Sequence, residues 1–189
     1  MPGKDLLRAD ALANRGRILD AADDVFSRGG EAASTEEVAR VAGVGIATVF
    51  RHFPTKAALL EAVLVRRFER LRDRAIKLEQ HDDPGAAFFE LFAQIVSDAS
   101  GKIAIAEAVV AAGGEHERSR HASEQLRQSI GVLLRRAQDA KTVRADVALD
   151  EVYALLVATS RGAASMQLNA DVRARLLAVL FDGLRPPRH

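Results

Sequence analysis

Apolar residues recur at helical spacing along almost the whole of this chain, and no segment alternates convincingly between apolar and polar residues. A period near 3.6 predicts amphipathic helices, whereas a strand covered on one face requires a period of two. The first stripe is formed by Ile18, Ala22, Val25 and Phe26, and it ends at Gly29-Gly30, a typical helix stop. The sequence therefore predicts an all-α fold with about nine helices.

Capping residues divide the chain into these helices. Ser34 and Glu37 have the spacing of a capping box, and Asp83 precedes a proline, which favours the first turn of a helix. Thr55 and Asn169 are further N-cap candidates. After the first stripe we expect a short helix ending at 42, then helices over 45–53, 56–78, 84–99, 102–112, a long segment ending near 141, 149–164 and 170–184.

Composition excludes several classes of protein. The 189 residues contain no cysteine, which excludes disulfides, thiolate catalysis and cysteine-ligated metals. The longest apolar stretch, Ile103–Ala112, is interrupted by Glu107 and is too short to span a membrane. The first residues do not form an apolar leader, so we expect a cytoplasmic protein. A net charge of +1 is too small for a non-specific architectural DNA binder.

One stretch departs from this balanced charge. No acidic residue lies between Glu37 and Glu61, whereas Arg40, Arg51 and Lys56 fall inside it. The same stretch contains two short predicted helices joined by a glycine-containing turn, which is the pattern of a helix-turn-helix. The second helix of that motif enters the major groove of DNA, and a surface that approaches phosphates has to lack carboxylates. This stretch therefore indicates DNA binding.

The second helix of the motif has two distinct faces. Its inward face carries Val44, Val49 and Phe53. Its outward face carries Ile46, Ala47, Thr48, Phe50, Arg51 and His52. Lys56 follows at the first turn of the next helix, where a cation opposes the helix dipole. That cost makes sense if the ammonium and the free backbone amides together hold a phosphate oxygen.

Residues 39–59, ARVAGVGIATVFRHFPTKAAL, resemble the TetR family of transcriptional repressors. The similarity spans about Arg15 to Val65, where caps, turn, core positions and a His-Phe-x-x-Lys motif coincide. It implies a helix-turn-helix domain over residues 1–65 and a helical domain over 66–189 that binds a small effector and forms a homodimer. It also implies a near-palindromic double-stranded DNA operator, which the repressor releases when the effector binds.

The resemblance assigns roles to individual residues. The expected DNA-binding residues are Thr35, Gly45, Ile46, Ala47, Thr48, Phe50, Arg51, His52 and Lys56. The two threonines would touch phosphate, Ile46 and Ala47 would face base edges, and the phenyl ring, the imidazole and the ammonium would hold the DNA backbone. Arg51 would contact either guanine or phosphate. The alternative for Ile46 and Ala47 is an ordinary surface position.

Two positions depart from the family pattern. Phe50 stands where the family usually has tyrosine, so a hydroxyl that would reach a phosphate is missing. Gly45 stands where serine or threonine often caps the helix, although glycine is an acceptable N-cap. Both departures predict fewer phosphate hydrogen bonds from side chains. The alternative for Phe50 is a ring in the core.

The second domain is expected to hold a largely apolar effector, because few charged side chains are directed inward. The candidate effector residues are Phe88, Phe89, Phe92, Gln94, Ile95, Gln125, Ser129, Tyr153 and Gln167. An aromatic stripe at helical spacing is also typical of a core, and that alternative stays open.

Two apolar stripes near the end of the chain are candidates for the homodimer interface. They consist of Val152, Leu155, Leu156, Thr159 and Ala163, followed by Leu176, Leu177, Leu180, Phe181 and Leu184. The alternative is that both stripes face the core of a single subunit. A twofold dimer would present two recognition helices to successive major grooves.

Patterns that would indicate an enzyme are weak, and we expect neither catalysis nor a cofactor. His116 and His121 resemble a zinc-protease motif but are five residues apart, so they lie on different faces of a helix. A cation site at His81-Asp82-Asp83 conflicts with the capping role of Asp83. Gly43-Val44-Gly45 follows a helix rather than the strand that a dinucleotide loop requires. The alternative function is a small-molecule-binding or enzymatic helical bundle with a vestigial helix-turn-helix.

Overall fold

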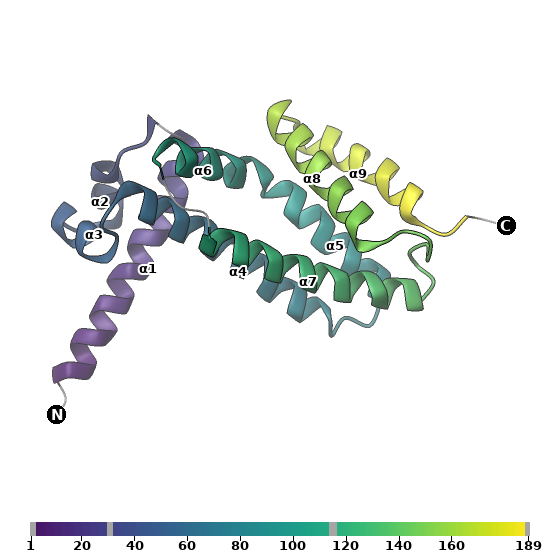
Figure 1. Ribbon diagram of the computed structural model, residues 1–189, viewed down its shortest axis with the longest axis horizontal. Coiled ribbons are helices and arrows are strands. Elements are labelled where there is room, and N and C mark those ends of the chain that lie inside the picture. The colour runs from purple at the N-terminus through teal and green to yellow at the C-terminus, as the bar shows by residue number, and fades with distance from the viewer. Residues whose placement is uncertain (1–2, 30–31, 114–116, 188–189) are drawn as a thin grey trace. The chain divides into compact units, whose positions relative to one another are not determined.

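The computed structural model describes residues 3–29, 32–113 and 117–187, and these residues form nine α-helices (Figure 1). The helices are α1 (Gly3–Gly29), α2 (Thr35–Ala42), α3 (Ile46–His52), α4 (Lys56–Leu78), α5 (Pro84–Ser97), α6 (Ala99–Ala111), α7 (Glu117–Asp139), α8 (Leu149–Ser165) and α9 (Ala170–Leu184). The predicted all-α fold is confirmed. In the described parts of the chain, none of these helices has both the length and the apolar character needed to cross a membrane.

Side-chain caps start four of the helices at the predicted residues. Backbone N–H groups donate to the side-chain oxygens of Ser34 (from Glu37, 3.1 Å), Thr55 (from Ala58, 3.0 Å), Asp83 (from Ala86, 2.9 Å) and Asn169 (from Val172, 3.0 Å). Each cap satisfies an amide that lacks an intrahelical partner. The carboxylate of Glu37, which was expected to complete a capping box, lies 3.9 Å from the guanidinium of Arg40.

The break between α5 and α6 differs from the sequence prediction. α5 ends at Ser97 and α6 begins at Ala99, because the chain turns at Asp98 rather than at Gly101. Asp98 keeps near-helical angles (φ −82°, ψ −3°), so the break is a small departure from the helix. Residue 98 is neither glycine nor proline, so the sequence carries no signal for a break there. α1 begins at Gly3, well before the first apolar stripe. Gly30 and Gly114, which were expected in helix stops, lie outside the described residues.

The chain packs as two compact units. The first consists of the residues up to Arg66 together with Ala104–Ser119, and the second of Arg67–Ile103 together with the residues from Arg120 onward. The segment Ala104–Ser119 thus groups with the N-terminal unit, whereas a boundary after residue 65 would assign it to the second domain. That boundary stays a prediction about the family's domain organisation.

The first unit is built around α1, which packs against α2 and α3. Ile18, Ala22 and Phe26 of the predicted stripe are completely buried, and Val38 and Val49 pack from α2 and α3. The guanidinium of Arg66 donates to the carbonyl oxygen of Gly16 and pairs with Asp20, which ties the end of this unit's α4 segment to α1. This core holds the two short helices in place.

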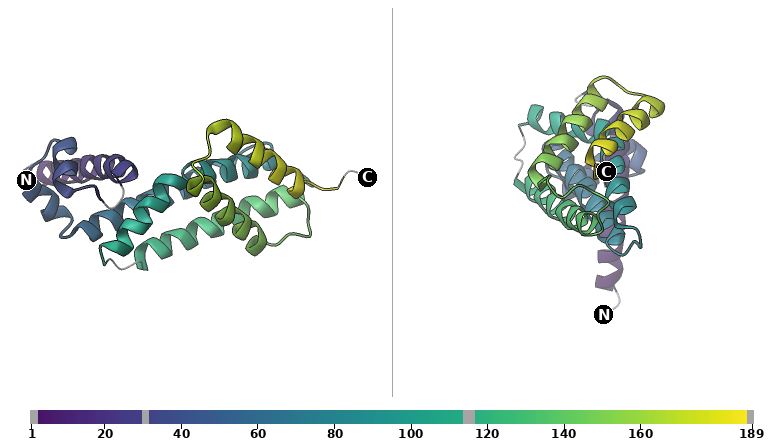
Figure 2. Two further views of the ribbon diagram at one scale, coloured as in Figure 1. Left: turned by 90° about the horizontal axis from the view of Figure 1, so that it is seen from above. Right: turned by 90° about the vertical axis from the view of Figure 1, so that its right-hand side faces the viewer.

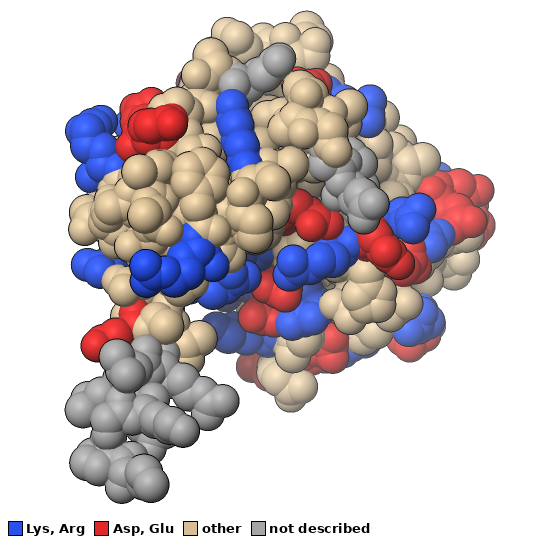
Figure 3. Space-filling model, turned by 60° about the vertical axis from the view of Figure 1, so that its left-hand side comes forward, with Lys and Arg blue, Asp and Glu red and all other residues tan. Residues whose placement is uncertain are grey.

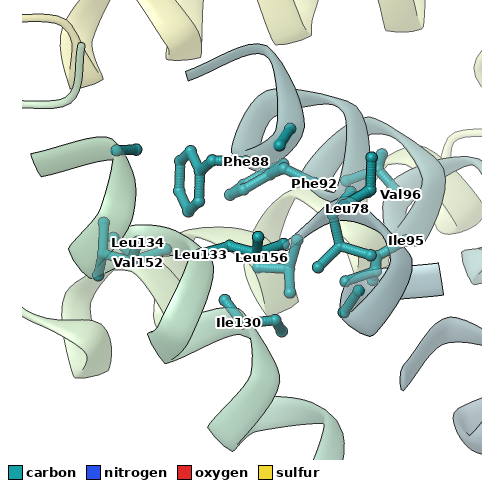
Figure 4. Close-up of a cluster of buried hydrophobic side chains, with 14 of the residues drawn as sticks. Leu78, Phe88, Phe92, Ile95, Val96, Ile130, Leu133, Leu134, Val152 and Leu156 are labelled. Carbon is teal, nitrogen blue, oxygen red and sulfur yellow. The ribbon is translucent and has the colours of Figure 1, made fainter. Parts of the chain in front are cut away.

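The second unit has its own hydrophobic core, to which its parts of α4, α5, α7, α8 and α9 all contribute (Figure 4). Phe88 and Phe92 lie beside Leu133, Val152 and Leu156 in this cluster. α8 and α9 run side by side in all views (Figures 1 and 2). The loop before α8 is fastened to the end of α9, because the backbone N–H of Arg144 donates to the carbonyl of Leu184 at 2.9 Å.

Candidate nucleic-acid interface

The turn between α2 and α3 depends on a glycine with a left-handed backbone. Gly43 has φ 66° and ψ 35°, a conformation that side-chain-bearing residues rarely adopt. Its N–H donates to the carbonyl of Arg40 at 3.3 Å, and the next amide, of Val44, donates to Ala39 at 3.0 Å. Gly45 then serves as the N-cap of α3 with an extended backbone and no side-chain cap. The turn therefore closes α2 and starts α3 within three residues.

α3 is anchored from beneath by a few apolar side chains. Val49 is fully buried, and Phe53, which ends the helix, is 3% exposed. These are the inward residues expected from the sequence, and Val44 is half-buried beside them. The opposite face of the helix is consequently fixed in orientation.

The outward face of α3 carries the residues predicted to contact DNA. Phe50 is 42% exposed, which contradicts the alternative in which its ring belongs to the core. Ile46 is 36% exposed, Ala47 and Arg51 are exposed, and Thr48 and His52 are half-buried. The structure therefore brings six predicted residues together on one short helix.

Thr35 differs from the others because its side chain is 6% exposed. It is the first residue of α2, where backbone amides lack intrahelical partners. A phosphate contact at this position would depend on the main chain more than on the buried hydroxyl. The role of Thr35 stays a prediction.

The charge around α3 is favourable to an anion. The nearest acidic residues along the chain, Glu37 and Glu61, are each nine positions from an end of α3. Glu37 is close to Arg40, whereas Arg51 forms no ion pair within the part of the chain that the structure describes. Figure 3 shows the side of the molecule that carries α2 and α3. An uncharged surface there is bordered by lysine and arginine side chains, and few acidic ones lie next to it.

Lys56 lies at the first position of α4, next to the Thr55 cap. Its Nζ atom lies 5.9 Å from the centroid of the buried Phe26 ring. This cation–π contact offsets part of the cost of a cation near a helix N-terminus. The sequence could not show it, because Phe26 is thirty positions away in α1.

The apolar residues predicted to line an effector site lie in or against the core of the second unit (Figure 4). Phe88, Phe92 and Ile95 are at most 2% exposed. Phe89 is half-buried, and the centroid of its ring lies 4.5 Å from the centroid of the Phe181 ring in α9. The alternative that this stripe is core therefore describes three of the four apolar candidates in this structure.

The polar effector candidates are not brought together at one point. Gln125 accepts a hydrogen bond from Arg72 at 3.0 Å and lies 3.1 Å from His121, and Ser129 donates to the carbonyl of Gln125. The Tyr153 hydroxyl lies 3.3 Å from that of Ser123. Gln94 and Gln167 are both exposed. The effector assignments of these residues stay predictions.

A cavity of about 480 Å³ lies at the end of α9, lined by Arg144, Asp182, Gly183, Arg185, Pro186 and Pro187. None of the predicted effector residues lines it. Its two arginines already pair with Asp146 and Asp182, and the hydrogen bonds from Arg144 lower the pKa of the Asp146 carboxyl. The cavity therefore has little uncompensated charge.

The predicted dimer residues divide into two sets. The side chains of Val152, Leu156, Ala163, Leu177 and Leu184 are enclosed by the subunit's own core, as the alternative foresaw. Leu155 and Leu176 are 40% and 38% exposed, and Thr159, Leu180 and Phe181 are half-buried. Only the second set is accessible to another subunit. The exposed Val179, which the sequence analysis did not include, lies on the same helix as Leu176.

The weak enzyme patterns keep their structural explanations. The Asp83 side chain caps α5, and the Asp83 N–H donates to Nδ1 of His81 at 3.0 Å. Among the described residues, no three histidine, aspartate or glutamate side chains are grouped so that they could hold a metal ion. His116 lies outside those residues, so the structure says nothing of its spacing from His121.

Comparisons with known proteins agree with this architecture. Residues 18–63 match the bacterial regulatory proteins of the tetR family, and residues 83–186 match the C-terminal domain of SbtR-like transcriptional regulators. The chain is 43% identical over 74 residues to the HTH-type transcriptional repressor KstR of Rhodococcus jostii. That match covers 38% of this chain and 35% of the repressor, so the curated relative is matched over about a third of its length.

Two crystal structures match over nearly the whole chain. A TetR transcription regulatory protein from Mycobacterium vanbaalenii is 39% identical, with 95% of this chain and 99% of that chain covered and a TM-score of 0.79. A TetR transcriptional regulator from Streptomyces coelicolor is 33% identical, with 92% and 99% covered and a TM-score of 0.77. Because the matches include both the helix-turn-helix and the C-terminal helices, the chain belongs to the TetR family of bacterial transcriptional regulators.

Proposed function

We propose that this protein is a ligand-responsive transcriptional repressor that acts in the cytoplasm. A homodimer binds a near-palindromic DNA operator through α3 of each subunit. A small, largely apolar effector bound in the C-terminal domain then causes release of the operator. No catalytic step belongs to this function.

The observation that carries the proposal is the outward face of α3. Ile46, Ala47 and Phe50 leave apolar surface exposed on a seven-residue helix that begins just after a tight turn. Exposed apolar groups with basic neighbours and without carboxylates suit a DNA groove, where thymine methyl groups and phosphates are the partners. A surface helix that faces only water usually carries charges of both signs, whereas no acidic residue lies between Glu37 and Glu61.

The residues of this face divide the work. Ile46 and Ala47 face base edges, and Arg51 contacts guanine or phosphate. Thr48, Phe50 and His52 hold the sugar-phosphate backbone, together with Lys56 and the amides at the start of α4. Gly45 adds no side chain at the start of α3, and the space around it is open, so the backbone there is accessible to DNA.

The C-terminal part of the proposal rests on the apolar surface of α8 and α9. Leu155, Leu176 and Val179 remain exposed after the core is formed, which favours a second copy of these helices as partner. The effector acts by population shift, since a ligand that binds one dimer geometry more tightly favours that geometry. If that geometry separates the two α3 helices by the wrong distance for successive grooves, DNA is released.

A charge placed on α3 tests the function. The probe is a duplex from the region immediately upstream of the protein's own coding sequence, and binding is measured by fluorescence titration. Ala47→Glu puts a carboxylate on an exposed position of α3 and should abolish binding without unfolding the protein. Ala86→Glu is the matched control, because Ala86 is an exposed residue in the first turn of α5, where an acidic side chain is favourable.

The alternative, a helical bundle with a vestigial helix-turn-helix, predicts a different result. In that case neither the wild-type protein nor the control binds the duplex above the level of a scrambled sequence. Equal binding by wild type and Ala47→Glu would show that DNA is held elsewhere on the protein.

A further inference from the structure

An arginine of α1 lies against the end of the recognition helix. The Cζ atom of Arg15 is 4.6 Å from the centroid of the Phe53 ring, well within cation–π range. Phe53 is the C-cap of α3, and its ring centroid is 6.4 Å from that of His52. Arg15 therefore lies next to the last residues of α3, although Arg15 and Arg51 are 36 positions apart in the sequence.

Arg15 is distinguished from the other arginines of this unit by what it contacts. Among residues 10–66, four other arginines have a side-chain partner. Arg17 donates to Asn14, and ion pairs join Arg28 to Asp24, Arg40 to Glu37 and Arg66 to Asp20. Arg15 and Arg51 have neither an ion-pair nor a hydrogen-bond partner within the described part of the chain. Arg51 belongs to α3 and Arg15 contacts the C-cap of α3, whereas a guanidinium that served only folding would be expected to find an acceptor.

The contact with Phe53 orients the guanidinium without using its hydrogen-bonding capacity. A guanidinium carries five N–H donors in a planar fork, and contact with an aromatic face occupies none of them. Arg15 is half-buried, so much of its side-chain freedom is already lost in the free protein. A ligand that accepts from this fork consequently has less side-chain entropy to remove. A phosphate oxygen pair matches such a fork in shape and charge.

We propose that Arg15 is a further DNA-phosphate contact, held by Phe53 beside the C-terminal end of α3. The inference rests on the proposed DNA-binding function and adds a residue from α1 to it. Arg15 and Lys56 then act alike: each is a cation positioned over a buried phenylalanine ring, Phe53 for one and Phe26 for the other. Because phosphate carries no sequence information, Arg15 adds affinity and not specificity.

The experiment measures how DNA affinity depends on salt. Wild type, Arg15→Gln, Arg15→Lys and Arg28→Gln are titrated with two duplexes, one from upstream of the protein's own coding sequence and one scrambled. Arg28 is the matched control, since it is an exposed arginine in the last turn of α1, thirteen positions after Arg15, and pairs with Asp24. Each variant is also denatured chemically, so that every titration is made on folded protein.

Arg15→Gln should weaken binding to both duplexes by about tenfold near 0.1 M salt and reduce the slope of log K against log salt by about one. Arg15→Lys keeps the charge and should restore the slope, and Arg28→Gln should behave as wild type. A wild-type slope for Arg15→Gln, or a reduced slope for Arg15→Lys, overturns the inference while leaving the proposed function intact. Failure of the wild-type protein to bind either duplex overturns the proposed function itself.

Discussion

α3 and α5 both carry aromatic and aliphatic side chains, but they use them in opposite ways. α3 has seven residues, of which Val49 alone is buried, and its Phe50 is 42% exposed. α5 has fourteen residues, of which seven are buried, and its Phe88 is 1% exposed. The long helix stabilises the fold through its apolar face. The short helix is held by a few contacts and leaves apolar groups uncovered.

This difference separates a surface maintained for binding from one maintained for stability. Burial of a phenylalanine side chain contributes about 1.5–3 kcal/mol through the removal of apolar surface from water, and α5 gains this repeatedly. α3 forgoes that gain at Ile46 and Phe50. Apolar groups that are exposed together on one short helix are typical of an interaction surface, and the proposed DNA complex would cover them.

The largest expected effect comes from removing one ring from each helix. Phe88→Ala should lower the free energy of unfolding by about 3–5 kcal/mol, because it leaves a cavity in the core of the second unit. Phe50→Ala should lower it by about 1 kcal/mol or less, because 42% of Phe50 is exposed and its ring has much less packing to lose. Chemical denaturation of both variants checks this comparison. A loss of several kcal/mol for Phe50→Ala would mean that its ring is packed after all.

The sequence predicted the helix-turn-helix in more detail than the C-terminal half. Gly43, the Ser34 and Thr55 caps and the inward Val49 act through neighbours a few residues away, and such local rules can be applied to a sequence. Arg15 was missed because its partner, Phe53, is distant in the chain.

For α5, local rules predicted the helix but could not tell whether its phenylalanines form a core or line an effector site. A stripe of phenylalanines at helical spacing looks the same whether it packs on a core or lines a ligand site. Only the arrangement of α7, α8 and α9 around Phe88 decides between them, and no local pattern encodes that arrangement. The dimer stripes failed to separate for the same reason, since Leu155 and Leu156 are neighbours with opposite exposure.

The next comparison adds a methyl group instead of removing a ring. A Cβ on Gly85 of α5 would lie 2.6 Å from Cβ of Thr142, so Gly85→Ala forces the loop after α7 to move. We expect a loss of about 1–3 kcal/mol, the usual cost of overpacking. No atom lies within 4 Å of a Cβ on Gly16 in α1, so Gly16→Ala should gain about 0.5–1 kcal/mol from higher helix propensity.

Chemical denaturation of both variants checks these two expectations. A shift of the midpoint, with the dependence of the unfolding free energy on denaturant unchanged, reports the change in stability. A neutral Gly85→Ala would show that the contact between α5 and the loop after α7 is looser than the structure has it. A destabilised Gly16→Ala would show that α1 is packed more tightly at that point.

Two lysines extend the comparison to charge. Lys56 and Lys102 each lie in the first turn of a helix with Nζ over a phenylalanine ring, at 5.9 Å and 5.4 Å. Lys56→Met should weaken DNA binding about tenfold, or about 1.4 kcal/mol, and reduce the salt slope by about one. Its stability should change by no more than about 0.5 kcal/mol, because the lost cation–π contact and the relieved dipole cost nearly cancel.

Lys102→Met should leave DNA affinity unchanged and act on stability. Burial lowers the pKa of Lys102 below its ordinary value of 10.5, despite the nearby Asp98. The folded state therefore holds this proton less tightly than the unfolded state, and the charged lysine costs stability at every pH below its folded pKa. Removing the charge should raise the free energy of unfolding at neutral pH. The gain should shrink as the pH rises towards 10.5, and a gain independent of pH would contradict the assignment.

The last comparison adds one hydroxyl to each ring. Phe50→Tyr places the hydroxyl at the edge of the proposed DNA surface, where a hydrogen bond to a charged phosphate is worth about 1.5–3 kcal/mol at best. Stripping water from the hydroxyl offsets part of this, so we expect binding to tighten about threefold to tenfold with unchanged stability. Phe88→Tyr puts the same hydroxyl into the core, where an unsatisfied group should lower the free energy of unfolding by about 1–3 kcal/mol and leave DNA binding unaltered. A binding titration and a denaturation curve on each variant make the test. Destabilisation of Phe50→Tyr without tighter binding would make α3 resemble α5 and remove the distinction between the two helices.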